Sequence, residues 1–213
     1  MNTYEKYRND SEINKILDSI NIINKGITGC HGRYHAMFVV DTVEHILKSL
    51  SYDSRTIELS KIAALMHDIG NIAGRNNHAR KSAMLASVFL DDPAHLSSDE
   101  KNMLIQAIED HSSGTNIQSV AGAALLIGDK VDISYKRVQV SESIDSWHKN
   151  LLEIKDVNIC VSDKVIQINY VTTEAFCQET LTSEYKKGFN LPIKAAKYLG
   201  CACNFLFNGE EFV

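Results

Sequence analysis

The sequence predicts an all-α helical bundle with a small C-terminal β-hairpin and further helices packed on it. Two observations favour helices: only two prolines occur among 213 residues, and apolar residues recur at spacings of three and four. A third observation predicts the hairpin, because residues 157–171, VNICVSDKVIQINYV, are rich in Val and Ile and partly alternate with polar residues. A chain of this length can bury a sizeable core.

Seven helices are expected in the first part of the chain, each from apolar residues that share one helical face. Their ranges are about 10–24, 32–51, 55–69, 78–91, 98–112, 118–133 and 141–154. Residues 97–100, SSDE, place a serine before the fifth of these helices and a glutamate three positions later. This spacing is typical of a capping box, which fixes where a helix begins.

The hairpin is expected to turn at Ser162, Asp163 and Lys164, where polar residues interrupt the apolar pattern. Helical patterning then returns at 173–187 and 191–206.

These patterns divide the chain into a helical domain over 1–150 and an appendage of hairpin and helices over 151–213. No Gly/Ser-rich linker separates the two parts, so we expect them to pack as one unit.

Composition and charge exclude several classes of function. The chain is 44% hydrophobic and 23% charged, as in soluble globular proteins, and no apolar run approaches the roughly 20 residues that cross a bilayer. The first residues, MNTYEKYRND, are too polar for a secretory signal. A net charge of −5 without a basic cluster argues against long nucleic acid as a partner. A small phosphorylated ligand remains compatible with it.

Five cysteines, an odd number without repeating spacing, argue against a disulfide framework and favour the reducing cytoplasm. Cys201 and Cys203 would need further soft ligands to form a zinc site, and none is apparent nearby. We therefore interpret both as small buried residues.

Five successive predicted helices each carry a histidine or an aspartate on an otherwise apolar face. For example, His35 lies four residues before Val39, and His111 lies three residues after Ile108. The inward-facing set consists of His35, His67, His78, His111 and Asp129, and Asp68 adds a second carboxylate beside His67.

A single buried histidine is more often a core residue with a hydrogen-bond partner than a metal ligand. Four imidazoles and two carboxylates are harder to explain in that way, because a buried ionised aspartate without a partner is costly. Divalent cations remove this cost by coordinating imidazole nitrogen and carboxylate oxygen. A ligand set without thiolate suits Fe, Mn, Co, Zn or Mg, and two ions more readily than one.

The other four histidines are interpreted differently. His45 falls on a polar helix face and His95 in a loop, so both are expected at the surface. His31 is flanked by glycines and is expected in a loop, where it could line the mouth of a pocket. His148 follows apolar residues and is interpreted as a packing residue that could also reach a substrate.

The ordered set of His35, the pair His67-Asp68, and Asp129 resembles that of the HD-domain superfamily of metal-dependent phosphohydrolases. RYHAMFVV is similar to the helix of the first histidine, ALMHDIGN to the defining His-Asp segment, and LLIGDKVD to the helix of the last aspartate. HARKSAMLASVFL and AIEDHSSG resemble the extra-histidine segments of members with two metal ions. The resemblance covers about residues 30–135 and implies a helical bundle.

The resemblance also implies a ligand set. His35, His67, Asp68 and Asp129 would hold one ion, and Asp68 would bridge to a second ion held by His78 and His111. His67 and Asp68 would be the catalytic pair, with Asp68 positioning and activating a water. Because it bridges two cations, Asp68 is not expected to act as a strong general base.

The chain departs from its relatives at two points. Asn71 stands where several relatives carry a lysine after HDIG, and no GYP tripeptide follows His111, so cleavage of cyclic dinucleotides is not indicated. Phosphate contacts are expected from Arg33 and Lys130. Weaker candidates near the proposed ligands are Arg75, Arg80, Lys81, Tyr34, Asn76 and Asn77.

Three functions remain open at this stage. The first is a phosphomonoesterase or phosphodiesterase acting on a small phosphorylated molecule, with a nucleotide as the first candidate. The second is a di-iron oxygenase, because some HD-scaffold proteins with four histidines and two aspartates have that activity. The third is a ligand-sensing module that keeps its metal for structural reasons. The appendage could close the pocket, bind a partner or form a homodimer contact.

Overall fold

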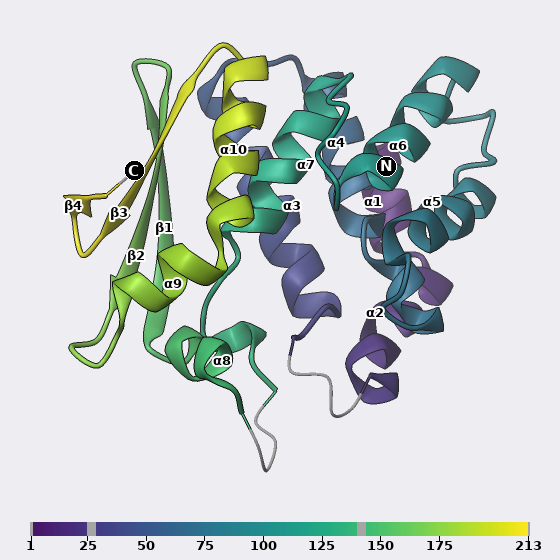
Figure 1. Cartoon of the computed structure of the whole chain (residues 1–213). Coiled ribbons are helices and arrows are strands. Elements are labelled where there is room, and N and C mark those ends of the chain that lie inside the picture. The colour runs from purple at the N-terminus through teal and green to yellow at the C-terminus, as the bar shows by residue number, and fades with distance from the viewer. Residues whose placement is uncertain (1, 25–28, 140–143, 213) are drawn as a thin grey trace.

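The computed structural model describes residues 2–24, 29–139 and 144–212 (Figure 1). The helices are α1 (Thr3–Arg8), α2 (Ser11–Ile23), α3 (Arg33–Ser49), α4 (Ser54–Met66), α5 (His78–Phe89), α6 (Ser98–Asp110), α7 (Val120–Val131), α8 (Ser146–Leu151), α9 (Gln178–Glu184) and α10 (Lys186–Tyr198). Two 3-10 helices, η1 (Ile69–Ala73) and η2 (Tyr135–Arg137), follow α4 and α7. The strands are β1 (Ile154–Ser162), β2 (Val165–Thr172), β3 (Ala202–Phe207) and β4 (Glu210–Glu211). The fold is mostly helical, as expected.

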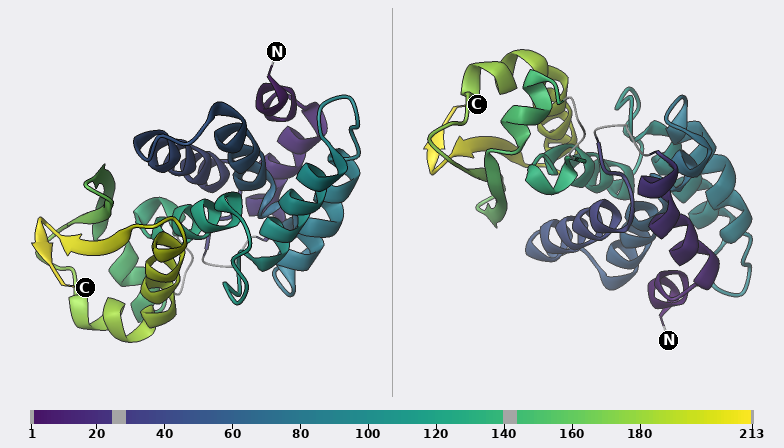
Figure 2. Two further views of the ribbon diagram at one scale, coloured as in Figure 1. Left: turned by 90° about the horizontal axis from the view of Figure 1, so that it is seen from above. Right: turned by 90° about the horizontal axis from the view of Figure 1, so that it is seen from below.

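Helix α7 occupies the centre of the molecule and contacts α3, α4, α6 and α10. Its sequence, VAGAALLIGDKV, is apolar on all sides, and nearly all of its residues are buried. Figures 1 and 2 show the sheet at one end of the molecule and α1, α2, α5 and α6 at the other. The central helix therefore connects the helical bundle with the C-terminal part.

The predicted capping box at the start of α6 is confirmed. The Ser97 side chain accepts a hydrogen bond from the Glu100 backbone nitrogen, and the Glu100 side chain accepts one from the Ser97 backbone nitrogen. Helices α4 and α6 end at Met66 and Asp110, a few residues earlier than the apolar periodicity predicts.

The predicted hairpin is also confirmed. Strands β1 and β2 pair antiparallel, with Ser162 opposite Val165, so that Asp163 and Lys164 form a two-residue turn. Both turn residues have positive φ, 48° and 60°, which is the backbone of a type I′ turn.

The prediction of one helix over 191–206 is wrong in its second half. Helix α10 begins earlier, at Lys186, and ends at Tyr198, and Gly200 then takes a φ of +75° that reverses the chain. Residues 202–207 form β3, which pairs in parallel with β2, while the short β4 pairs antiparallel with β3. The alternation of Cys203, Phe205 and Phe207, all buried, is the strand signal that helical periodicity obscured.

The helix predicted over 141–154 is shorter in the structure, where only α8 (Ser146–Leu151) is helical. Residues 140–143 lie outside the described residues, and Ile154 already belongs to β1.

The C-terminal sheet shares one apolar cluster with the helical bundle. Ile46 of α3 and Leu126 of α7 lie in this cluster together with Ile166, Tyr170 and Phe205 of the sheet. Helix α10 packs on α7 and lies between it and the sheet (Figure 1). Within the described residues, no helix is both long enough and apolar enough to span a bilayer.

We expect Gly70→Ala to destabilise the fold. A Cβ at Gly70 would lie 2.2 Å from the backbone nitrogen of Ser82 and 2.6 Å from the carbonyl oxygen of His78, so η1 and α5 would have to separate. Crowding of this kind costs about 1–3 kcal/mol or more. Urea unfolding should show the loss. Ala73→Ser, an exposed change on the same 3-10 helix, should leave the free energy of unfolding unchanged.

Candidate metal centre

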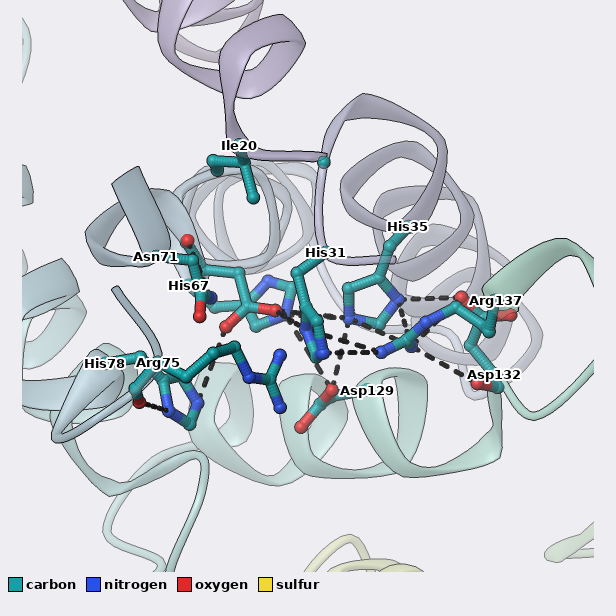
Figure 3. Close-up of polar contacts among 12 residues, drawn as sticks. Ile20, His31, His35, His67, Asn71, Arg75, His78, Asp129, Asp132 and Arg137 are labelled. Carbon is teal, nitrogen blue, oxygen red and sulfur yellow. Dashed lines mark hydrogen bonds and ion pairs between the residues drawn. The ribbon is translucent and has the colours of Figure 1, made fainter. Parts of the chain in front are cut away.

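The structure gathers the six inward-facing residues of the sequence into one cluster, with the Asp68 carboxylate at its centre. Figure 3 shows His35, His67, His78 and Asp129 of this cluster. The six residues come from five separate elements: His35 from α3, His67 and Asp68 from the end of α4, His78 from the start of α5, His111 from the end of α6, and Asp129 from α7. All except His78 are buried, and His78 is half-buried.

Each oxygen of Asp68 faces a different pair of imidazoles. Oδ2 lies 3.6 Å from Nε2 of His35 and 3.5 Å from Nε2 of His67. Oδ1 lies 3.5 Å from Nε2 of His78 and 3.6 Å from Nε2 of His111. One carboxylate thus stands between two pairs of nitrogen atoms, which is the arrangement of a bridging ligand.

In His67 and His111, the nitrogen farther from Asp68 is Nδ1. The hydrogen bond that this nitrogen makes determines which ring nitrogen carries the hydrogen. Nδ1 of His67 donates to the carbonyl oxygen of Ala64 (2.8 Å), and Nδ1 of His111 donates to that of Ile108 (2.6 Å). A carbonyl oxygen only accepts, so the hydrogen must lie on Nδ1. In the neutral ring, Nε2 then presents its lone pair to Asp68. Both residues occupy the position after the last residue of a helix, where the ring satisfies a carbonyl that the helix leaves unpaired.

The hydrogen of His35 also lies on Nδ1, where a carboxylate accepts it in place of a backbone oxygen. Its Nδ1 lies 2.7 Å from Oδ2 of Asp132, and both side chains are fully buried. An aspartate behind a ligand histidine orients the ring and strengthens its other nitrogen as a donor to metal.

These lone pairs face one another at short range. Nε2 of His35 and Nε2 of His67 are 3.1 Å apart, and Nε2 of His35 is 3.2 Å from Oδ1 of Asp129. Two ligand atoms at about 2.1 Å from one ion lie about 3.0–3.4 Å apart in octahedral or tetrahedral coordination. Without a cation or additional protons, the lone pairs would repel.

An unpartnered oxygen gives independent support for a cation. Oδ1 of Asp68 is buried and has no hydrogen-bond partner among the described residues. A buried carboxylate oxygen without a partner is costly, and a cation bound by His78 and His111 would remove that cost. Three groups in the described residues could hold an ion: His31, His35 and Asp68; His35, His67 and Asp129; and His67, Asp68 and His111. The residues present therefore fit a divalent metal.

Both carboxylates of the cluster are ionised. Burial alone would raise the pKa of Asp68, but the nearby His67 and His31 imidazoles hold it well below its ordinary value. Burial likewise opposes the ionisation of Asp129, yet Lys130 and the neighbouring imidazoles hold its pKa well below the usual range.

The pKa shifts of the imidazoles differ in direction. Burial lowers the pKa of His67, but the Asp68 and Asp129 carboxylates more than offset this, so its pKa is raised. Burial lowers the pKa of His78, and it lowers that of His31 to about 3 despite the nearby Asp68. His31 and His78 are therefore neutral near pH 7, as metal ligands must be.

Sequence reasoning missed three residues that contact the cluster. His31 is buried, with Nδ1 2.6 Å from Oδ2 of Asp68, where only a place at a pocket mouth was expected. Asp132 supports His35. Arg137 donates from Nη1 to the Asp132 carbonyl oxygen (3.2 Å), and its guanidinium lies within 3.4 Å of ring nitrogens of both His31 and His35.

His31 lies four residues before His35, and this helical spacing was the one sequence signal that placed it near the cluster. Arg137 lies in the short η2 helix, which has no apolar periodicity to mark it.

The predicted phosphate-binding residues occupy different environments. Lys130 forms an ion pair with Asp129, a member of the cluster. Arg33 pairs with Asp18 and donates to Asn14, both on α2, and makes none of the contacts described for the cluster. The roles of Arg33 and Lys130 in substrate binding remain predictions.

Arg75 was a weaker candidate, and its environment is unusual. Its Nη1 is buried and has no hydrogen-bond partner within the part of the chain that the structure describes. Burial lowers the pKa of its guanidinium. In Figure 3 its side chain extends into the space beside His78 and Asp129.

The remaining candidates lie outside the cluster. Lys81 donates to the carbonyl oxygens of Ala73 and Gly74, while Arg80, Asn76, Asn77 and Tyr34 are exposed. His45 is exposed and His95 pairs with Asp92, as expected of surface residues. Asn71 is buried and donates to the backbone oxygen of Asp68.

A cavity adjoins the cluster on the side of His31 and Asp129. Its volume is about 360 Å³, and its lining includes His31, Asp129 and Asp132 on the metal side. The cationic side chains of Arg75, Lys130 and Arg137 also line it, together with Trp147, His148, Leu151 and Tyr185. A second cavity of about 310 Å³ between α6 and α7 touches only His111 of the cluster and has no cationic lining residue.

Comparisons with known proteins give one similar solved structure to report. No protein-family model and no curated protein matches the chain. The solved structure is described as a predicted HD superfamily hydrolase from an uncultured Thermotogales bacterium. The two chains are 23% identical with a TM-score of 0.46, and the match covers 63% of this chain and 75% of that one. Its description names the superfamily that the residue pattern resembles.

We expect Asp68→Asn to abolish metal binding. The amide removes the negative charge and one of the two oxygens that face the imidazole pairs. Metal content measured by mass spectrometry after loading with Mn²⁺ and dialysis should fall to background. The exposed His45→Ala variant should retain the wild-type content, and equal content in Asp68→Asn would contradict the proposed centre.

Asp132→Ala is expected to weaken metal binding without unfolding the protein. His35 would lose the acceptor that orients its ring, and such losses typically reduce metal affinity about 10- to 100-fold. Calorimetric titration with Mn²⁺ measures the change. An unchanged affinity would show that Asp132 does not position His35.

Proposed function

We propose that this chain is a metal-dependent phosphohydrolase of the HD superfamily that acts on a small phosphorylated molecule, with a nucleotide as the first candidate. One observation carries the proposal: Asp68 stands between two pairs of imidazole nitrogens, and the neighbouring Asp129 lines a cavity together with cationic side chains. This combination suits an anionic substrate that must meet a metal-held water.

The metal would be held by the residues of the cluster. His35, His67 and Asp129 are close enough to share one ion. His78 and His111 would hold a second ion on the other side of Asp68, whose carboxylate faces both pairs of rings. When bound, divalent ions lower the pKa of a coordinated water and neutralise charge on phosphoryl oxygens. Asp68 and His67 are the residues we assign to holding this water in place.

The chain's own cations would bind the phosphate. Arg75 carries a buried guanidinium nitrogen that has no partner among the residues that the structure describes, and a phosphate oxygen in the cavity would supply an acceptor. Arg137 is already committed to Asp132, and Lys130 to Asp129. Arg75 is therefore the cation most available to a substrate.

A phosphate-release assay tests the proposal. Purified protein is depleted of metal, reloaded with Mn²⁺, Mg²⁺, Co²⁺, Zn²⁺ or Fe²⁺ in turn, and offered nucleotides and sugar phosphates without oxygen. Metal-dependent release that Asp68→Asn abolishes is expected. Turnover only with iron and oxygen would favour the di-iron oxygenase, and tight ligand binding without turnover would favour the sensing module.

Arg75→Ala should lower kcat/KM for phosphate release about 10- to 100-fold, because a charge-assisted hydrogen bond to the substrate is lost. Arg80→Ala, which removes an exposed arginine nearby, is the matched control and should behave like wild type. Metal content should be equal in all three proteins. If Arg75→Ala keeps full activity, phosphate binds elsewhere in the cavity.

A further inference from the structure

The cavity at the metal centre is shared between the two parts of the chain. The metal side comes from the chain just before α3 and from the end of α7, whereas Trp147 comes from α8, near the end of the helical part, and Tyr185, the residue before α10, comes from the C-terminal appendage. Both aromatic residues line the same cavity as Arg75. The proposed phosphate-binding residue and an aromatic surface therefore face one space.

The two aromatic rings are held in a fixed arrangement. Trp147 and Tyr185 stack with ring centroids 5.1 Å apart and an interplanar angle of 29°. The Tyr185 hydroxyl donates to the Lys130 carbonyl oxygen (3.0 Å), which ties the pair to α7 one residue beyond Asp129. Phe189 packs edge-on against Tyr185 from the other side. A surface ordered in this way loses little entropy when a flat ligand binds it.

Function of the metal centre alone does not require this aromatic pair. Metal binding uses imidazoles and carboxylates, and phosphate binding uses charged guanidinium groups, whereas an indole is not a metal ligand and offers only one uncharged N–H donor. Aromatic side chains beside a cationic groove are the usual means of binding a nucleobase, because every base offers a flat face.

We propose that Trp147 of α8, supported by Tyr185, binds the planar ring of the substrate, so that this aromatic pair selects phosphate esters of nucleosides. This inference rests on the proposed function, because it assumes that a phosphate occupies the same cavity. The side chain of His148, whose Nδ1 pairs with Asp145, lines the cavity beside Trp147.

The chain contains one tryptophan, so its fluorescence reports directly on the proposed contact. The metal-loaded wild-type protein is titrated with the non-hydrolysable methylene phosphonate of adenosine 5′-monophosphate and, separately, with methylphosphonate, which lacks a ring. Excitation is chosen where adenine does not absorb. Quenching by the adenosine compound alone is expected. Calorimetric binding of that compound without any change in emission would overturn the inference.

Variants test the same contact through kinetics. Trp147→Leu should raise KM for adenosine 5′-monophosphate about 5- to 100-fold while leaving KM for ribose 5-phosphate unchanged. Trp147→Phe keeps a ring and should restore most of the loss. Tyr198→Leu, which removes an exposed aromatic side chain from α10, is the matched control and should change neither.

The two proposals can fail separately. If the wild-type protein hydrolyses both esters and Trp147→Leu affects both equally or neither, the ring-binding role is wrong and the phosphohydrolase assignment stands. If no metal supports hydrolysis of any ester and no phosphonate binds, the phosphohydrolase assignment is wrong, and the ring-binding proposal falls with it.

Discussion

An ionised carboxylate in a protein interior needs positive charge around it. For Asp68 this requirement determines which side chains the surrounding helices place next to it. Its side chain is 2% exposed, and each of its oxygens faces a pair of imidazole nitrogens. The rings of His35, His67 and His111 cannot supply hydrogens to it without becoming charged, because their hydrogens are directed to backbone oxygens and to Asp132. A cation resolves this conflict, and the surrounding helices place the ligands that would bind it.

The helix ends explain why chain segments far apart in sequence can build so compact a centre. His67 and His111 each follow the last residue of a helix, and each ring bonds the carbonyl three residues earlier. The same local geometry thus satisfies the helix terminus and aims Nε2 inward. Asp68 and η1 then turn the chain towards α5, where the close approach at Gly70 brings His78 to the cluster.

Much of this arrangement could be predicted from the sequence, because helical periodicity alone places His35 and Asp129 on buried faces. The same logic fails where periodicity ends. Arg137 follows α7 in a short 3-10 helix, so no pattern of spacing marks its contact with His35. The strand β3 was mistaken for helix because apolar residues in CACNFLF fit both periods, and the parallel partner β2 that decides between them is more than thirty residues away. Long-range pairing of that kind is invisible to local patterns.

The apolar cluster that joins α3 and α7 to the sheet has a consequence for how such a chain could change during evolution. Ile46 and Leu126 are covered by Ile166, Phe205 and their neighbours, so removing the C-terminal strands would leave hydrocarbon of the bundle facing water. The C-terminal region is therefore not a module that can be lost or exchanged freely. Its replacement would demand simultaneous changes on α7, the helix that carries Asp129 to the centre.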